Sequence, residues 1–163
     1  MAEQSIIISD RHLRAIGLIA VIWSGIEQAM EIAICGLYSI DLNRGLVLTA
    51  NIGFRSRVDL LRILAKNGAI RDKRDAAICL GLLTRIEKAY VTRNEAVHGG
   101  WGPSPDPTKA RRMSIRARGS QLRCVSEDVS AEELEASVQK IGILGADFTD
   151  LVDRLGLFPK PKG

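Results

Sequence analysis

The stretch with the strongest structural signal spans residues 10–37 and reads DRHLRAIGLIAVIWSGIEQAMEIAICGL. Its apolar residues recur at alternating steps of three and four, which is typical of a helix that packs against another helix. Ser9 or Asp10 is the expected N-cap. The pattern therefore predicts a long helix whose contact seam comprises Leu13, Ile16, Ala20, Trp23, Glu27, Met30, Ile34 and Leu37.

Glu27 is the one charged residue on this seam. A carboxylate at a core position needs a partner, because an unpaired buried charge costs several kcal/mol. Its partner could be an arginine or histidine of a functional site or an ordinary interhelical ion pair, and the side chain could also be exposed where the seam widens. The same helix carries a second apolar side, which predicts a central position or a dimer interface: Leu18, Val21, Ile22, Ala29 and Ile32.

The rest of the chain continues the helical pattern. Amphipathic periodicity predicts a short helical segment at 46–52, a helix at 54–66 and a long helix from about 72 to 98. Gly81 falls inside this long helix, where a close approach to another helix is the expected reason for a glycine. A capping box formed by Ser130 and Glu133 predicts a last helix that ends near Leu155.

Two alternating segments, 112–118 and 121–125, flank Gly119 and Ser120 and predict a β-hairpin within residues 110–126. The expected fold is therefore mainly α: a bundle of four to five helices with a small β-hairpin insertion before the last helix. With 163 residues and 46% hydrophobic content, residues 1–163 are expected to form a single domain, with residues 156–163 as a flexible tail.

Composition narrows the function classes. Residues 1–9 lack the pattern of a signal peptide, and Glu27 and Glu31 interrupt the most apolar stretch, so we expect a cytoplasmic protein without a membrane span. The three cysteines are far apart, which predicts neither a disulfide framework nor a metal site. Phosphate-binding glycine loops, dinucleotide-binding motifs and serine-hydrolase elbows are absent from the sequence, and no cofactor is expected.

The candidate site lies at the end of the long helix, where residues 93–101 read RNEAVHGGW. On a helix Tyr90, Asn94 and His98 share one face, and Arg93 lies about 100° to the side. His98 is near the helix C-terminus, where the helix dipole favours an imidazolium. Residues 102–107 are rich in proline and predict a surface loop after Gly99 and Gly100. The predicted catalytic residues are Arg93, Asn94 and His98, with possible support from Glu27, Tyr90 and Trp101.

A simpler interpretation makes His98 an ordinary helix-ending histidine and Arg93 the partner of Glu27 in a dimeric scaffold. His12, the other histidine, begins a helix in a polar setting and is expected to be an ordinary surface residue.

Arg93, Asn94 and His98, late in a long helix of an all-α domain of this size, resemble the arginine, polar residue, three further residues, histidine motif of the HEPN superfamily. Residues 54–64 also resemble the helix that commonly precedes this motif. Some toxin members carry a tyrosine two residues after the histidine; Gly100 occupies that position here, so that tyrosine's role is not carried over. The hairpin is an insertion relative to the minimal helical bundle.

The resemblance implies a metal-independent endoribonuclease that acts as a homodimer and leaves 2′,3′-cyclic phosphate ends. A role as the toxin of a toxin–antitoxin or phage-defence pair, with an antitoxin protein as partner, is one that the resemblance suggests. His98 would be the general acid or base, Arg93 would stabilise the phosphorane, and Asn94 would orient His98 or the phosphate. The alternative is a non-catalytic module that binds nucleotide, RNA or a protein partner, with Gly99, Gly100 and Trp101 as a lid.

The hairpin carries a local excess of positive charge. Residues 109–123 contain six basic residues and no acid, although the net charge of the whole chain is only +4. Such a block can bind polyanions even in a nearly neutral chain, and it can equally be the solvated face of an edge strand. The predicted RNA-binding residues are Lys109, Arg111, Arg112, Arg116, Arg118 and Arg123.

Overall fold

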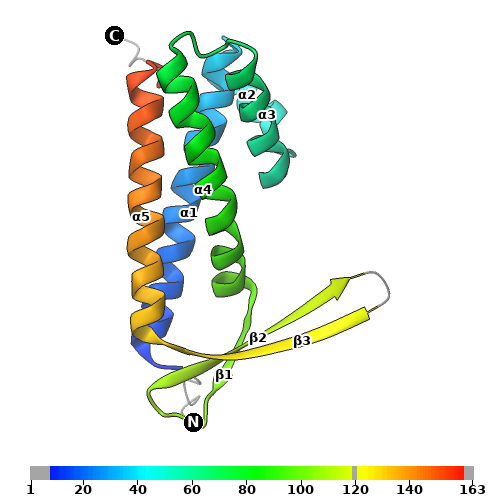
Figure 1. Cartoon of the computed structure of the whole chain (residues 1–163), viewed down its shortest axis with the longest axis vertical. Helices are drawn as coiled ribbons and strands as arrows, with labels where there is room; N and C mark the ends of the chain where they lie inside the picture. The colour runs from blue at the N-terminus through cyan, green and yellow to red at the C-terminus, as the bar shows by residue number, and fades with distance from the viewer. Residues whose placement is uncertain (1–7, 119–120, 160–163) are drawn as a thin grey trace. The chain divides into compact units, whose positions relative to one another are not determined.

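The computed structural model describes residues 8–118 and 121–159 (Figure 1). It confirms the expected fold class: the described residues form five helices and a three-stranded antiparallel sheet that precedes the last helix. The predicted turn at Gly119 and Ser120 and the last four residues of the tail lie outside the described residues. The elements are α1 (Asp10–Leu37), α2 (Leu42–Thr49), α3 (Phe54–Lys66), α4 (Lys73–His98), β1 (Gly100–Pro103), β2 (Lys109–Arg118), β3 (Gln121–Ser130) and α5 (Ala131–Arg154).

Local hydrogen bonds account for the starts of α4 and α5. Asp72 precedes α4, and its Oδ1 accepts hydrogen bonds from the backbone N–H groups of Arg74 (2.8 Å) and Asp75 (2.9 Å). The predicted capping box of α5 is present, since Glu133 Oε2 accepts from Ser130 N (2.7 Å) and Ser130 Oγ accepts from Glu133 N (3.2 Å). These bonds satisfy N–H groups that have no partner inside the first turn of a helix.

The prediction for the short second helix was wrong by about four residues. It was expected at 46–52, but α2 spans Leu42–Thr49. Asp41, interpreted as a break, is its N-cap and accepts from the N–H groups of Asn43 (3.1 Å) and Arg44 (3.3 Å). An aspartate before a short apolar segment starts a helix as readily as it ends one.

The chain divides into two compact units, and each is described separately. The first comprises Met1–Ile22 and Tyr90–Ile141, and the second comprises Trp23–Ala89 and Gly142–Gly163. The prediction of a single domain stays a prediction.

Trp23 organises the core of the second unit. Its ring is fully buried and packs at a tilt against Phe54, with ring centroids 5.3 Å apart. Its Nε1 donates a hydrogen bond to Glu27 Oε1 at 3.0 Å, so the carboxylate on the predicted seam has its hydrogen-bond donor within this unit. Arg57, with a side chain 11% exposed, pairs with Glu31 at 2.8 Å.

In the first unit, α1 is rotated relative to the predicted seam. His12, Ala15 and Ile19 are buried, whereas Leu13 is 45% exposed and Val21 is 70% exposed. The buried face is therefore shifted by one position from the predicted one. Because α1 is apolar on both sides, its periodicity does not specify which side faces the core.

By length and composition, α1 could cross a membrane: its best 18-residue window has a mean hydropathy of 1.5. Core helices of helical bundles meet the same criteria, and 44% of this window is buried inside the protein.

Gly81 does not mark a close helix approach, contrary to the prediction. It is exposed, and a Cβ built on it has no heavy atom within 4 Å. Alanine here should therefore stabilise the protein by about 1 kcal/mol, since it removes the conformational freedom that glycine adds to the unfolded chain. Urea denaturation should show a higher midpoint for Gly81→Ala, and a lower one would mean that this surface is covered in solution.

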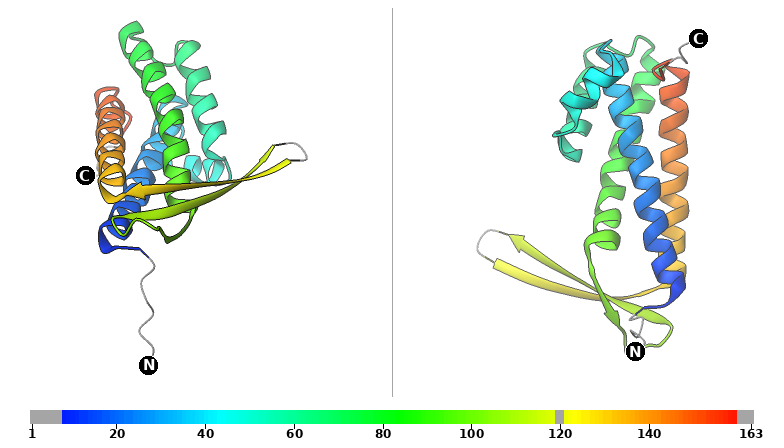
Figure 2. Two further views of the ribbon diagram at one scale, coloured as in Figure 1. Left: turned by 60° about the horizontal axis from the view of Figure 1, so that its bottom comes forward. Right: turned by 180° about the vertical axis from the view of Figure 1, so that it is seen from behind.

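The sheet belongs to the first unit and has the strand order β1-β2-β3 (Figure 2). Part of the predicted surface loop is a strand, because Gly100–Pro103 pairs with the beginning of β2, with Trp101 opposite Arg112. Antiparallel pairing of β2 with β3 then runs from Lys109 opposite Ser130 to Arg118 opposite Gln121. The glycines and the proline of β1 gave no strand pattern in the sequence. Proline is tolerated in β1 because β1 is an edge strand.

His12 is not an ordinary surface residue. It is 3% exposed, its Nε2 lies 3.0 Å from the carbonyl oxygen of Val129 and its Nδ1 lies 2.7 Å from Ser9 Oγ. A carbonyl can only accept, so Nε2 carries the proton and, in the neutral ring, Nδ1 accepts from the serine hydroxyl. The histidine joins the start of α1 to the end of β3.

We expect the first unit to lose stability in acid. Arg111 lowers the pKa of the Asp128 carboxyl, and Arg11 lowers that of Glu135. A lowered pKa in the folded state gives stability that is complete above the ordinary carboxyl pKa of about 4 and is lost as the pH falls through the folded value. Urea midpoints should be lower at pH 3 than at pH 7, and equal midpoints would contradict this. The groups concerned are Asp106, Asp128, Glu132, Glu133 and Glu135.

Candidate functional site

The structure brings the three predicted catalytic side chains together at the end of α4. One guanidinium nitrogen of Arg93, NH1, donates to Asn94 Oδ1 at 2.9 Å and lies 2.7 Å from His98 Nε2. Arg93 and Asn94 are half-buried, whereas His98 is exposed. A cation, an amide and an imidazole therefore share one patch of the first unit, and the imidazole faces solvent.

The contact between Arg93 and His98 identifies the ring nitrogen that accepts a hydrogen bond. A guanidinium has donors and no acceptor, and it stays protonated in proteins. His98 Nε2 must therefore accept, which places the proton of the neutral ring on Nδ1. An imidazolium, with both nitrogens protonated, could not make this bond.

Arg93 also retains an unused donor. Its Nε is buried and has no hydrogen-bond partner among the described residues. A buried donor without an acceptor costs about 1–3 kcal/mol. In its resting conformation Arg93 therefore makes hydrogen bonds through NH1 and leaves the N–H of Nε without an acceptor among the described residues.

Trp101 supports the end of α4. Its Nε1 donates to the carbonyl oxygen of Ala96 at 2.9 Å, one of the carbonyls that the last turn of a helix leaves without an internal partner. Because Trp101 lies in β1 and not in an irregular loop, this bond ties the sheet to the helix turn that carries His98. The lid predicted for Gly99, Gly100 and Trp101 in the alternative function stays a prediction.

Gly99 is required directly after the histidine. A Cβ at this position would lie 2.5 Å from the carbonyl oxygen of Glu95 and 3.0 Å from Cγ of Arg112. Gly99→Ala should therefore displace the chain at the end of α4 and destabilise the protein by about 1–3 kcal/mol. Urea denaturation checks the stability loss. Gly81→Ala, a glycine substitution inside α4 with open space around it, is the control, and equal effects of the two substitutions would contradict the close contact at Gly99.

Acidic partners neutralise the half of the hairpin that is paired with β1. Arg112 contacts Glu127 at 2.6 Å and Glu95 of α4 at 3.1 Å, and its side chain is 14% exposed. Arg111 forms two bonds with Asp128, of 2.8 and 3.0 Å, which raises the pKa of the arginine and lowers that of the aspartate. The expectation of an uncompensated basic block is wrong for this half.

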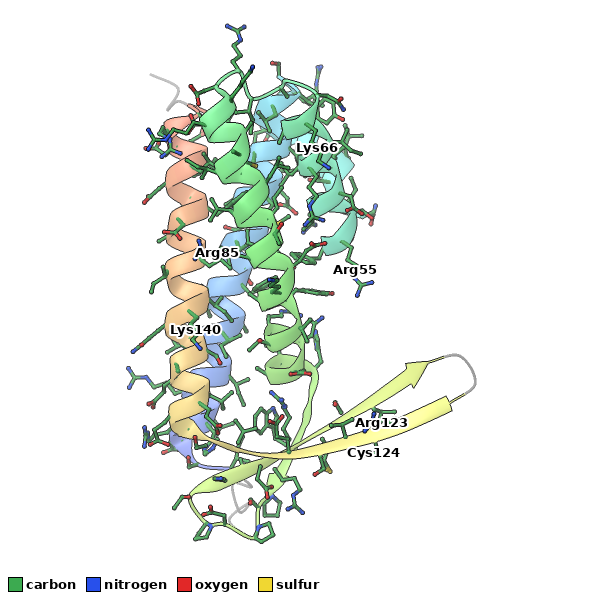
Figure 3. All side chains as sticks on the ribbon, viewed as in Figure 1. Arg55, Lys66, Arg85, Arg123, Cys124 and Lys140 are labelled. Atoms are coloured by element: carbon green, nitrogen blue, oxygen red, sulfur yellow. The ribbon has the colours of Figure 1, made fainter. Side chains whose placement is uncertain are left out.

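The outer half of the hairpin, residues 114–125, contains three arginines: Arg116, Arg118 and Arg123. Strand register places Arg116 opposite Arg123, and residues 114–125 contain no acid. Arg123 and Cys124 are both exposed on β3 (Figure 3), and neighbouring positions of a strand face opposite sides. The side chains of Arg116 and Arg118 lie outside the description; Lys109, at the start of β2, is exposed.

The remaining predicted residues are placed as follows. Tyr90 is half-buried on α4 in the first unit, whereas Glu27 belongs to the second unit and accepts from Trp23. Sequence reasoning missed Glu95 and the structural role of Arg112. The predicted two-residue turn could have revealed part of this role, since a hairpin closed at 119–120 places Arg112 opposite Glu127.

Comparisons with protein-family models, with curated proteins and with solved structures find no match to this chain.

Proposed function

We propose that the protein is a metal-independent endoribonuclease of the HEPN type, which acts as a homodimer and cleaves RNA through its own 2′-hydroxyl. The observation that carries the proposal is the cluster of Arg93, Asn94 and His98, with NH1 of the arginine 2.7 Å from the histidine ring. The similarity of this motif to the HEPN motif adds to it.

The three groups fit the needs of the reaction. A base must take the proton of the 2′-hydroxyl as its oxygen attacks phosphorus, and positive charge must stabilise the phosphorane. An acid must then protonate the 5′-oxygen as its bond to phosphorus breaks, leaving a 2′,3′-cyclic phosphate. His98 is the acid or base, and Arg93 holds the phosphorane oxygens.

One copy has too few groups for this chemistry. A single histidine cannot act as base and acid in the same concerted step, whereas two copies related by a twofold axis provide two histidines and two arginines. We assign the base to His98 of one copy and the acid, which protonates the leaving 5′-oxygen, to His98 of the other. The exposed apolar residues of α1, including Leu13, Leu18 and Val21, are available for contact with a second copy.

The outer half of the hairpin would hold the RNA backbone. Arg116, Arg118 and Arg123 lie in a segment without acids, and arginine binds phosphate by paired hydrogen bonds. Lys109 remains a candidate, whereas Arg111 and Arg112 are committed to carboxylates and would mainly hold the hairpin in place.

The test is cleavage of a single-stranded RNA in EDTA, with analysis of the new ends. The expected products carry 2′,3′-cyclic phosphate and 5′-hydroxyl ends, and the DNA of the same sequence stays intact. Loss of activity on dilution below the dissociation constant of the dimer would support the composite site. Binding of RNA without cleavage would instead favour the non-catalytic module.

The toxin role is a separate part of the proposal. Expression should arrest growth of a bacterial host, and co-expression of an antitoxin protein should relieve the arrest. Growth unaffected by an active ribonuclease would remove the toxin role and leave the enzyme.

A further inference from the structure

We infer that the hydrogen bond between Arg93 and His98 is a phosphate-operated gate: it occupies Nε2 of the histidine at rest, and an RNA phosphate releases Nε2 by binding the guanidinium. The inference rests on the proposed function for its substrate, but its physical content concerns these two side chains and any phosphate monoanion or dianion. Asn94 is the positioning residue that holds the guanidinium in the resting place.

The resting geometry blocks the histidine in both of its roles. With Nε2 accepting from NH1 at 2.7 Å, its lone pair is not free to take a proton from a 2′-hydroxyl. A protonated Nε2 would place its N–H against an N–H of the guanidinium, so the acid form is also incompatible with the contact. His98 is exposed to solvent, but its Nε2 is occupied by the hydrogen bond from Arg93.

A phosphate is the ligand that can compete for Arg93. Guanidinium–phosphate pairs are charge-assisted and frequently bidentate, whereas a neutral imidazole offers a single lone pair. Rotation of the guanidinium toward a phosphate would also give Nε, which has no partner among the described residues, an acceptor. The same movement withdraws NH1 from Nε2, so the base becomes free when the scissile group is in place.

Asn94 explains why the guanidinium rests where it does. Its Oδ1 accepts from the same NH1 at 2.9 Å, so NH1 is held between the amide and the imidazole. The contact that Asn94 makes in this structure is with the arginine, and its predicted role of orienting His98 or the phosphate stays a prediction.

The test uses the full chain labelled with ¹⁵N, with long-range ¹H–¹⁵N spectra of the imidazole rings. The chain has two histidines, and His12 is an internal control because its Nε2 donates to Val129, so the two neutral rings should show opposite tautomers. His98→Gln assigns the signals. Inorganic phosphate should shift the Nε2 signal of His98 relative to sodium chloride at equal ionic strength and pH, and the signals of His12 should stay unchanged.

Variants locate the effect. Arg93→Gln should abolish the response of His98 to phosphate. Asn94→Ala should move the resting Nε2 signal toward its value with phosphate, while Asn94→Asp, which keeps an acceptor at Oδ1, should retain the resting signal. A purely structural role of Asn94 predicts no change in either variant.

The inference is overturned if His98 carries its proton on Nε2 at rest, or if its signals do not respond to phosphate. Cleavage of RNA by a protein without the response would leave the proposed function intact and remove the gate. A clear response in a protein that never cleaves RNA would keep the gate as a phosphate-binding device and remove the nuclease.

Discussion

His98→Ala is expected to lower the rate of RNA cleavage by about two to four orders of magnitude, the usual contribution of a general acid or base. The stability of the folded state should change little, because His98 is exposed and its hydrogen bond to Arg93 is exposed to solvent. A gel assay of single-stranded RNA in EDTA measures the rate, and circular dichroism verifies the fold.

Val91→Ala is the matched control, since Val91 is 54% exposed on the same helix and within the same unit. It should cleave at the rate of the unchanged protein. Arg93→Lys keeps the positive charge and loses the planar fork that binds two phosphate oxygens, so it should also be slow. If His98→Ala and Val91→Ala were equally active, His98 would have no catalytic role.

Trp23→Ala should have the largest effect on stability, a loss of about 3–5 kcal/mol in the free energy of unfolding. The ring is fully buried against Phe54, so alanine leaves a cavity. The substitution also removes the donor of Glu27 Oε1, and a half-buried carboxylate without this bond adds to the cost. Urea denaturation measures the change, which would be a large part of the 5–15 kcal/mol typical of folded proteins.

Two variants separate the contributions of Trp23. Trp23→Phe retains most of the apolar volume and loses the N–H, so its smaller effect isolates the bond to Glu27. Val47→Ala, at a residue of the same unit that is 74% exposed, should change stability by less than about 0.5 kcal/mol. A loss in Trp23→Ala as small as that in Val47→Ala would show that the ring is not part of a packed core.

Interactions between residues close together in the sequence were predicted, whereas interactions between distant residues were missed. The start of α5 was predicted because Ser130 and Glu133 are three residues apart and bond to each other. The proximity of Arg93, Asn94 and His98 was predicted for the same reason, since all three lie within two turns of α4. The burial of His12 was missed because its partner, Val129, is 117 residues away.

The charges of the hairpin also divide into a part that the sequence shows and a part that depends on the fold. The basic residues of 109–123 can be counted in the sequence, but their neutralisation depends on strand register. Arg111 and Asp128 are separated by 17 residues, and they meet because β2 and β3 pair in one register out of several. The pairing of Arg112 with Glu95 depends in addition on how β2 lies against the end of α4.

Local sequence signals specify the helical class, the start of α5 and the position of the arginine–histidine motif at a helix end, because caps, glycine stops and apolar periodicity act over a few residues. The folded structure decides which face of α1 is buried, that Arg111 and Arg112 pair with acids, and where the guanidinium of Arg93 rests. The last of these depends on a rotamer and a hydrogen-bond acceptor, Nε2 of His98, that no spacing of residues specifies. The motif in the sequence therefore identified the groups, and the structure showed that at rest they engage each other.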